Sequence, residues 1–349
     1  MKKRLVLLAI ISALALTISA CGGGGSGSGA KDTGKAAKAS KSDANTLGIG
    51  YTTGANENDP YHLTATKFKE IVEKKSNGRI KVNTFHSSQL GSEPEMWEGM
   101  QSGMCDMAVM TNAYLSTYVH ANGALDLPFI FKDLKQARTV LDGEYGKKLI
   151  DNMANTGVTC LAFSEGGFRQ LCTRDKGIKA PADLTGLKIR CMETKIYLSA
   201  YKALGVNATP MAWGELLTAL QQGTVDGCDA PLSVLYTNGF PDICKYIDNV
   251  NLFYSPLPVC ISTEKFKAFS AEDQKMLREA AVEAAKFVKN NNDTKAAGME
   301  ADLTKKGMTI VKDVDTKAFQ AKVLPAWNEM ESYIGKEWVD SLKKQIGTK

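Results

Sequence analysis

The sequence has few of the residues on which catalysis and metal binding depend. Its 349 residues include only three histidines, His62, His86 and His120, and no two of them stand at metal-ligand spacing. A Cys-x-x-Cys pair is absent, which excludes a zinc knuckle and a thioredoxin-type site. The motifs G-x-S-x-G, H-E-x-x-H and G-x-x-x-x-G-K-[ST] are absent too. The sequence therefore predicts no catalytic residues, no metal and no cofactor, and it favours a protein that is not an enzyme.

An excess of charge of one sign is also lacking. The formal net charge is +5, and Lys2, Lys3 and Arg4 supply three of these charges. The rest of the chain has 40 Lys and Arg against 38 Asp and Glu, so there is no electrostatic case for nucleic acid. Hydrophobic residues make up 44% of the chain, which excludes a disordered protein. The length predicts about two domains at about 150 residues each.

The longest apolar run is short and lies at the N-terminus. Residues 5–18 follow a basic start and are too few to cross about 30 Å of hydrocarbon as a helix, so they fit a secretory signal. The run ends in Ile18-Ser19-Ala20-Cys21, which resembles the lipobox of bacterial lipoproteins, in which the cysteine is diacylated. An ordinary signal with a chance cysteine is the alternative. We expect a signal peptide over residues 1–20 and lipidation at Cys21.

Residues 21–45 consist mainly of Gly, Ser, Ala, Lys and Asp and offer nothing to bury. A flexible linker of this length has an r.m.s. reach of about 25–30 Å. We therefore expect the folded part to be extracytoplasmic and held near the cell membrane, or the periplasmic face of a membrane, by the lipid on Cys21.

Expected strands and helices alternate after residue 46. The strands are 47–51, 80–84, 105–110, 158–163, 187–191, 224–227 and 251–262; the helices are 60–76, 93–102, 134–154, 196–204, 213–222, 232–239 and 271–306. Such βαβ alternation predicts an α/β fold with mainly parallel sheets. The last helix would be about 50 Å long, too long for one small lobe, so we expect it to bridge two.

One segment repeats within the chain. Residues 100–106 (MQSGMCD) resemble residues 220–226 (LQQGTVD): in each, an apolar helix stops at a glycine and an aspartate opens the next strand. Any loop between a helix and a strand can look like this. The other interpretation is that the chain has two similar α/β lobes, and its length favours that interpretation.

Six further segments closely resemble the solute-binding proteins of TRAP transporters, of the C4-dicarboxylate-binding type. They are residues 89–93 (QLGSE), 127–131 (LPFIF), 167–170 (GFRQ), 182–190 (ADLTGLKIR), 203–211 (ALGVNATPM) and 215–227 (ELLTALQQGTVDG). These matches follow the family's order from about residue 47 to at least residue 262. The long helix fits the remainder.

The resemblance implies a two-lobed fold like that of the periplasmic binding proteins, each lobe a mainly parallel sheet flanked by helices. Lobe I would hold residues 46–166 and 255–294, and lobe II residues 167–254 and 295–349. A monomer of this kind would close on a small carboxylate, such as a dicarboxylate, a sugar acid or a 2-oxo acid. It would deliver the acid to TRAP membrane permease subunits driven by an ion gradient.

The resemblance also implies the ligand-binding residues. A family arginine that clamps the ligand carboxylate corresponds to Arg190, and a second one to Arg169. The family commonly reads G-Q-E-N-P where this chain reads Gly-Cys-Asp-Ala-Pro at 227–231, so Ala230 replaces an asparagine that often contacts ligand. That departure leaves the C4-dicarboxylate specificity open. The further candidates, which are expected to line or flank the cleft, are Trp213, Glu93, Asn112, Tyr51, Asp229 and Tyr236.

Two questions stay open at the level of sequence. The chain could instead be a ligand-sensing domain for a membrane receptor or a secreted lipoprotein enzyme, although no catalytic set supports the latter. Of the eight cysteines, seven remain once Cys21 is assigned to lipid, an odd number, so at least one thiol is not paired within the chain. Cys105, Cys160 and Cys191 fall in expected buried strands, which favours free thiols in the core.

Overall fold

The computed structural model describes residues 45–347. The expected signal peptide (1–20), Cys21 and the linker (21–45, apart from Asn45) lie outside the described residues. Within residues 45–347, no helix is both long enough and apolar enough to cross a membrane.

The described residues form one sheet of nine strands, in the order β2-β1-β3-β8-β4-β7-β5-β6, with β9 beside β8. The strands are β1 (Thr46–Gly50), β2 (Lys81–Phe85), β3 (Met107–Val109), β4 (Val158–Thr173), β5 (Lys188–Cys191), β6 (Asn207–Pro210), β7 (Gly227–Pro231), β8 (Tyr246–Ser262) and β9 (Thr309–Val311). Pairing is parallel in β2-β1-β3 and in β7-β5-β6. The expected α/β fold is confirmed, and the antiparallel strands β4 and β8 join its two parallel halves into a single sheet.

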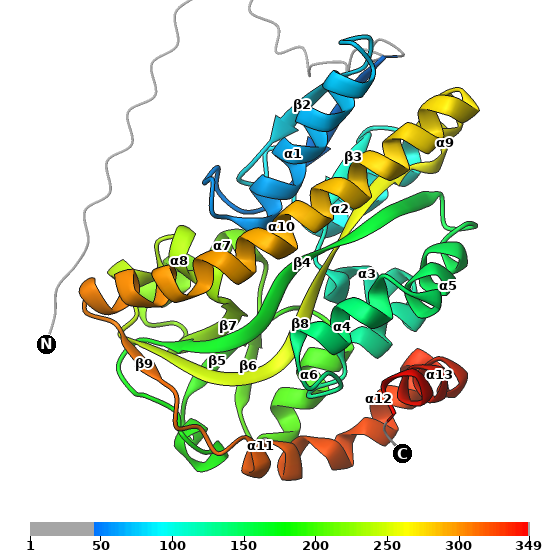
Figure 1. The fold of residues 1–349 in the computed structure, drawn as a ribbon. Coiled ribbons are helices and arrows are strands. Elements are labelled where there is room, and N and C mark those ends of the chain that lie inside the picture. The colour runs from blue at the N-terminus through cyan, green and yellow to red at the C-terminus, as the bar shows by residue number, and fades with distance from the viewer. Residues whose placement is uncertain (1–44, 348–349) are drawn as a thin grey trace, which may run out of the picture. The chain divides into compact units, whose positions relative to one another are not determined.

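Helices cover the sheet and follow most of its strands (Figure 1). They are α1 (Pro60–Lys75), α2 (Glu93–Ser102), α3 (Asn112–Tyr118), α4 (Leu134–Leu141), α5 (Glu144–Asn152), α6 (Lys195–Ala203), α7 (Trp213–Gln222), α8 (Leu232–Thr237), α9 (Thr263–Lys267), α10 (Ala271–Lys305), α11 (Thr316–Val323), α12 (Trp327–Ile334) and α13 (Lys336–Ile346), with a 3-10 segment, η1 (His120–Asp126), after α3.

The two parallel halves are built from the same folding unit. The segment β1-α1-β2-α2-β3 gives the strand order β2-β1-β3, and β5-α6-β6-α7-β7 gives β6-β5-β7. Helices α2 and α7 end at Gly103 and Gly223 in the left-handed conformation that glycine tolerates. Asp106 Oδ2 then accepts a hydrogen bond from the Gly48 amide at 2.9 Å, and Asp226 Oδ2 accepts one from the Lys188 amide at 2.8 Å. The internal repeat of the sequence thus marks two equivalent units.

Strands β4 and β8 run through both halves. They pair from Val158 with Ser262 to Thr173 with Tyr246, with three register shifts along the way. The strand expected over 158–163 and a second strand that the sequence begins near Arg169 form one continuous β4, because the register shift between Glu165 and Gly167 lets the strand pass a Gly-Gly pair that would otherwise end it. Strand β8 begins five residues earlier than expected, at Tyr246. Gly167 has φ +98°, a conformation that favours glycine.

The long helix α10 packs against both halves, as expected. It crosses obliquely over β4 in Figure 1 and lies against α1 on one side and α8 on the other. Ser270 caps its start by accepting a hydrogen bond from the Asp273 amide at 3.1 Å. Residues 290–293, Asn-Asn-Asn-Asp, are weak helix formers in the middle of the helix.

The three expected lobe boundaries lie side by side. Glu165 pairs with Pro256, Gly167 pairs with Ser255, and Asn292 of α10 donates to the Glu165 carbonyl at 2.9 Å. The partition into lobes remains a prediction. The three places where the chain would pass from one lobe to the other lie together in the fold.

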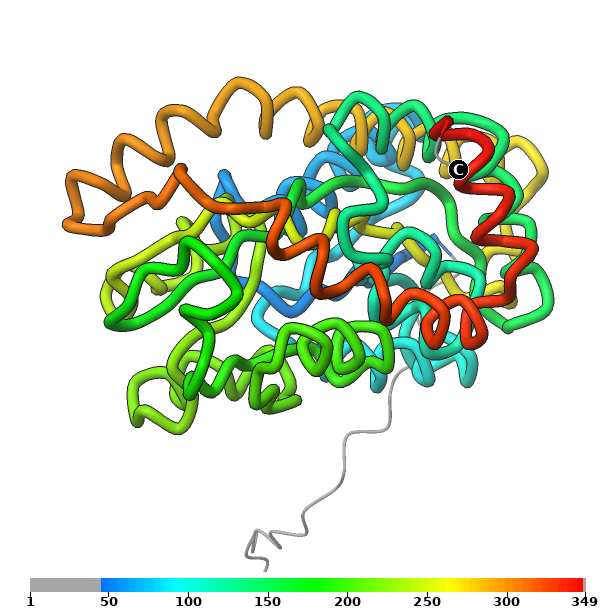
Figure 2. The backbone as a smooth tube through the Cα atoms, turned by 90° about the horizontal axis from the view of Figure 1, so that it is seen from below, coloured from blue at the N-terminus to red at the C-terminus, as the bar shows by residue number. Residues whose placement is uncertain are grey.

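The C-terminal segment does not stay with the second half, to which residues 295–349 were assigned. Helix α11 packs against α6, but α13 packs against α4 and α5 (Figure 2). Tyr145 Oη donates to the Trp338 carbonyl at 3.0 Å, and Gln136 Nε2 donates to the Ile346 carbonyl at 3.1 Å. Residues 336–346 therefore pack with residues of lobe I, because the apolar face of α13 is buried there.

The helix expected over 134–154 is divided into α4 and α5. Gly143 between them has an extended conformation, φ −99° and ψ −162°, and starts a new helix. A Cβ on Gly146 would lie 1.9 Å from the Leu141 carbonyl oxygen, so the sharp turn requires glycine. The neighbouring Asp142 accepts a hydrogen bond from Lys289 of α10 at 2.6 Å, which gives the break a contact with the long helix.

All seven cysteines of the described residues are buried, and none of them forms a disulfide. Cys160 faces Cys260 across β4 and β8, and Cys172 faces Cys228 across β4 and β7. Burial raises the pKa of the Cys105 thiol to about 12, so the reactive thiolate is scarce at neutral pH.

We predict that the core thiols are free and protected. In a full chain carrying Cys21→Ser, a thiol reagent should titrate seven groups after denaturation under non-reducing conditions, and essentially none in the native protein within the same time. The expected reason is that burial excludes the reagent and disfavours the thiolate. A count of one free thiol after denaturation would show that three disulfides form, and would contradict the prediction.

Candidate ligand-binding site

A cavity lies where the carboxyl ends of strands from both halves of the sheet meet. Open α/β sheets bind ligands at such ends. Its lining comes from the segments after β1, β3 and β5, from β4, the end of β5 and the end of β7, and from the first turns of nearby helices. The residues are Thr52, Thr53, Tyr61, Glu93, Thr111, Tyr114, Arg169, Arg190, Met192, Trp213, Ala230, Pro231 and Val234. The enclosed space is about 20 Å³, room for about one water molecule, so the walls lie close together in this conformation.

Arg190 of β5 is buried in this cavity without an ionic partner. It is 1% exposed, and its Nε and Nη2 both donate to the Met211 carbonyl, at 3.0 and 2.8 Å. These two bonds fix the plane of the guanidinium. The ion-paired arginines among the described residues are Arg79, Arg138 and Arg169. Arg190 therefore keeps its charge and part of its hydrogen-bonding capacity unmatched within residues 45–347.

Arg169 of β4 is also buried, but its charge is balanced. Its Nε donates to Asp229 Oδ2, and its Nη2 donates to the Asp229 carbonyl at 2.5 Å. Burial disfavours the charged guanidinium, yet Asp229 more than compensates and raises the pKa of Arg169. The Tyr197 ring lies 5.6 Å from its Cζ. Asp229, expected as a ligand residue, thus acts as the counter-ion of Arg169 and does not line the cavity.

Glu93 begins α2 and faces the same cavity. Its carboxylate accepts hydrogen bonds from the Thr111 amide at 2.9 Å and from Thr111 Oγ1 at 2.7 Å, and Tyr61 Oη lies 2.6 Å from that hydroxyl. Burial raises the pKa of Glu93 to about 7, against the hydrogen bonds from Thr111 and the charges of Arg169 and Arg190, which lower it. The site therefore contains a carboxyl group that changes charge near neutral pH.

Trp213 forms a wall of the cavity at the start of α7. Its ring also packs on Phe240, with ring centroids 5.7 Å apart, so it serves packing and lining at once. A second cavity of about 80 Å³ adjoins the first and shares four residues with it: Thr52, Glu93, Tyr114 and Trp213. The site thus extends past Trp213 toward Ser88 and Ser92, in a direction rich in hydroxyl groups.

Ala230 lines the cavity from β7 at the position of the family asparagine. It is 1% exposed and presents only a methyl group. The polar groups nearest in the lining come instead from other segments, among them Thr53, Tyr61 and Thr111. This side of the site is consequently less polar than an asparagine would make it.

Besides Asp229, three candidates do not reach the cavity. Tyr51 is buried behind β1 and its Oη lies 2.6 Å from His62 Nδ1. Asn112 is buried in α3 and donates to Asp126 Oδ2 at 2.7 Å. Tyr236 of α8 donates to Asp302 of α10 at 3.2 Å, on the other side of the sheet. In each case a neighbour in sequence lines the cavity instead: Thr52, Thr111 and Val234.

The lining residues that the sequence reasoning missed are mostly hydroxyl-bearing: Thr52, Thr53, Tyr61, Thr111 and Tyr114. Thr52, Thr53 and Thr111 immediately follow expected strands, so their position at strand ends is the signal by which they could have been found. Tyr61 could not be placed this way, because it reaches the cavity from the first turn of α1. In the part of the chain that the structure describes, no group of three or more His, Cys, Asp or Glu side chains is placed to hold a metal ion.

Known proteins with a similar sequence and fold identify the family of this chain. Residues 51–333 match the family model described as bacterial extracellular solute-binding protein, family 7. A solute-binding protein of Verminephrobacter eiseniae is 35% identical over 298 residues, which cover 85% of this chain and 88% of that protein. A TRAP periplasmic solute-binding protein of Polaromonas sp. JS666, bound to D-erythronate, superposes with a TM-score of 0.82 at 35% identity, covering 85% of this chain and 98% of that one.

A sugar acid binding protein of Advenella mimigardefordensis, in complex with galactonate, superposes with a TM-score of 0.83 at 30% identity, covering 86% of this chain and 97% of that one. The match to the family model extends over most of the chain and includes every residue that lines the cavity. The two-lobed fold expected from the sequence is that of these structures. This chain belongs to the bacterial extracellular solute-binding proteins of family 7, the solute-binding proteins of TRAP transporters.

Proposed function

We propose that this protein captures a sugar acid or a similar hydroxylated monocarboxylate in the cavity around Arg190 and delivers it to the membrane subunits of a TRAP transporter. The observation that carries the proposal is the buried, unpaired guanidinium of Arg190. A buried charge without a partner costs several kcal/mol, about the scale on which an anionic ligand can supply the missing interaction. A carboxylate fits the planar fork of an arginine through two parallel hydrogen bonds.

The charges of the site favour one carboxylate rather than two. Arg169 is already matched by Asp229, so only Arg190 offers an unbalanced positive charge among the lining residues. The remaining polar lining consists mainly of hydroxyl groups and the carboxyl of Glu93, which suit the hydroxyl groups of a ligand. Two relatives support this choice, since their ligands are D-erythronate and galactonate, both hydroxylated monocarboxylates.

Capture requires the walls to separate, because the cavity of about 20 Å³ is smaller than any such acid. We infer that lobe I (46–166 and 255–294) and lobe II (167–254 and 295–335) part at the crossing of β4, β8 and α10, with residues 336–346 moving with lobe I. Gly166-Gly167 and residues 290–293 of α10 lie together there, and both segments are rich in residues that favour regular secondary structure least. The ligand would then shift the population toward the closed form.

The remaining parts of the proposal concern the environment of the protein. We infer that residues 1–20 are removed, that Cys21 carries lipid, and that the folded part works as a monomer outside the cell membrane or in the periplasm. The linker of residues 21–45 would give it a reach of about 25–30 Å, enough to move between membrane and permease.

The ligand class and the clamp are tested together by calorimetry on the purified full chain. Aldonates and similar hydroxy acids should bind more tightly than C4-dicarboxylates of comparable size, and Arg190→Met should weaken the best acid by at least about a hundredfold, because a charge-assisted bidentate pair is lost. Lys188→Gln, on the same strand but outside the cavity, is the matched control and should leave affinity within about twofold. Unchanged affinity in Arg190→Met would rule out the clamp.

The two arginines should differ in what they do for the empty protein. Arg169→Met leaves Asp229 buried and unpaired, so we expect the free energy of unfolding to fall by about 3–5 kcal/mol. Arg190→Met removes an unpaired buried charge but leaves the Met211 carbonyl without its two donors, so that free energy should fall by no more than about 1–2 kcal/mol, less than in Arg169→Met. Urea denaturation of both variants without ligand measures the difference. Adding Asp229→Asn to Arg169→Met should restore part of the loss; equal destabilisation by the two single variants would contradict this division of roles.

Binding should weaken as the pH rises. The ligand carboxylate is ionised above about pH 5, whereas Glu93, with its pKa raised to about 7, is largely neutral at pH 6 and ionised at pH 8. The ionised form repels the ligand, so Kd should rise by about three- to tenfold over that interval, and binding near pH 7.5 should take up protons. Glu93→Gln should abolish both effects, and the exposed Glu98→Gln on the same helix should not. A Kd that is flat from pH 6 to 8 in the unmutated chain would exclude Glu93 from the site.

A further inference from the structure

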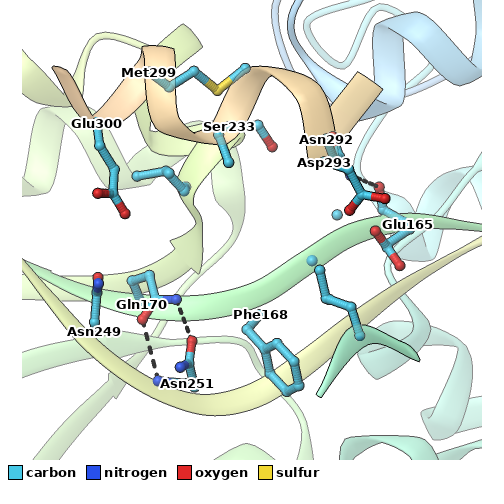
Figure 3. Close-up of a pocket in the computed structure, with 15 residues that line it drawn as sticks. Glu165, Phe168, Gln170, Ser233, Asn249, Asn251, Asn292, Asp293, Met299 and Glu300 are labelled. Carbon is cyan, nitrogen blue, oxygen red and sulfur yellow. Dashed lines mark hydrogen bonds between the residues drawn. The ribbon is translucent and has the colours of Figure 1, made fainter. Parts of the chain in front are cut away.

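A third and larger cavity lies behind the sheet, away from Arg169 and Arg190. It has a volume of about 450 Å³, is bordered by α10 above, β4 and β8 below and the first turn of α8 at one side, and opens to solvent near the exposed Ala296 (Figure 3). This volume lies within the range of small-molecule sites, about 300–1,000 Å³. The cavity is distinct from the site around Arg190, because the two sets of lining residues have no member in common.

The polar lining of this rear cavity is dominated by side-chain amides. Gln170, Asn249, Asn251 and Asn292 contribute to it from three different elements. Gln170 Nε2 donates to Asn251 Oδ1 at 2.5 Å, and the backbone N–H of Asn251 donates to Gln170 Oε1 at 3.3 Å, so this pair is held in place (Figure 3). An amide both donates and accepts hydrogen bonds, as a hydroxyl group does. Such a lining suits a ligand with several hydroxyl groups.

Two buried polar atoms in the lining lack a partner. Ser233 is 5% exposed, and its hydroxyl forms no hydrogen bond with any described residue; the same is true of Asn292 Oδ1. Both residues line the rear cavity. Buried polar groups are nearly always hydrogen-bonded, so these two atoms leave hydrogen-bonding capacity that a polar molecule between α8 and α10 could use.

The charges of the rear cavity exclude an acid. Among the described residues that line it, the charged ones are Glu165, Asp293 and Glu300, all acidic. Each already has a cation: Arg138 bonds to Glu165 and Asp293 at 2.7–2.8 Å, and Lys312 bonds to Glu300 at 2.6 Å. No positive group of the lining is left for a carboxylate, and the acids need no further cation. A neutral ligand matches this balance.

The rear cavity also has an apolar side. Phe168, Leu232 and Met299 belong to its lining. An aromatic ring and aliphatic groups can cover the C–H face of a sugar ring or polyol while the amides bind its hydroxyl groups. This combination of amides and apolar groups differs from the site around Arg190, which we call the front site and in which a guanidinium is the dominant feature.

Both cavities are built on the same segment of β4. Because successive side chains point to opposite faces of a sheet, Arg169 faces the front site while Phe168 and Gln170 face the rear cavity. Pro231 ends β7 at the front site, and Ser233 follows it at the rear cavity. A molecule in the rear cavity would therefore contact the reverse side of the strand that carries Arg169, at the crossing of β4, β8 and α10.

From these observations we infer that the rear cavity is a second binding site, which takes a neutral polyhydroxylated molecule of about the size of a monosaccharide. The inference goes beyond the proposed capture of an acid and does not depend on it. Hydroxyl groups of the ligand form hydrogen bonds with the side-chain amides, and Phe168 packs on its apolar face. An anionic sugar does not bind, because the lining has no free cation.

The experiment is calorimetry of the full chain with galactitol, mannitol, galactose and myo-inositol as probes. At least one of them should bind with Kd in the millimolar range or below, a free energy of about 4 kcal/mol or more. Ala296→Trp places a large side chain in the rear cavity from the exposed face of α10 and should weaken that binding by at least about tenfold. Ala297→Trp, exposed at the next position and outside the lining, is the matched control and should change Kd by less than about twofold.

Two further measurements separate the sites. Arg190→Met should leave the polyol affinity within about twofold while acid binding is lost, and Ala296→Trp should leave acid binding within about threefold. The inference is overturned if no probe binds at concentrations up to about 50 mM, or if binding survives Ala296→Trp. It is also overturned if polyol binding is lost in Arg190→Met, which would place the polyol in the front site, or if small organic ammonium compounds bind there in preference to polyols. Failure of acid binding alone would refute the proposed function and leave this site standing.

Discussion

The antiparallel pairing of β4 with β8 is the interaction on which the rest of the structure depends. These strands are the only long ones in the described part of the chain, and each half of the sheet is completed against them: β3 pairs with β8, and β7 pairs with β4. Because they pass through both halves, the ends of β1, β3, β5 and β7 are brought to one place. The front site, the rear cavity and the crossing with α10 are all consequences of that single ladder and of its register shifts.

Three arginines show how the fold distributes buried charge. Arg138 is bonded to Glu165 and to Asp293, which ties α4, β4 and α10 together at the crossing. Arg169 is matched by Asp229 within the second half of the sheet. Arg190 alone among them is held by a carbonyl group and no carboxylate. An arginine with a structural role has a carboxylate partner within the chain, whereas an arginine that binds a ligand lacks one. Burial makes an unpaired charge costly in free energy, so a buried arginine without a partner indicates binding.

Much of this could be predicted from the sequence, for identifiable reasons. The alternation of strands and helices, the repeat ending in Gly103-to-Asp106 and Gly223-to-Asp226, and the position of Arg190 follow from local patterns. A strand over 158–163 and a second one beginning near Arg169 were expected, but their fusion into one continuous β4 could not be predicted, because a bulge at Gly166 depends on the partner strand. Asp229 was assigned to the ligand because sequence does not show that the side chain of Arg169 reaches it from the neighbouring strand. The packing of α13 on α4 was missed for the same reason: an amphipathic helix reveals its apolar face but not the surface that covers it.

The interleaving of the two halves has a consequence for how the chain matures. The first half needs β8, α10 and α13, and α13 ends at Ile346, three residues before the last residue of the chain. No N-terminal stretch can complete either half during synthesis, since every core requires contacts between segments far apart in sequence, and such contacts form slowly. A chain with this topology cannot complete its first half until residues 336–346 are available, and before then it is at least partly unfolded. That is the condition in which a polypeptide can still be threaded through a narrow export channel.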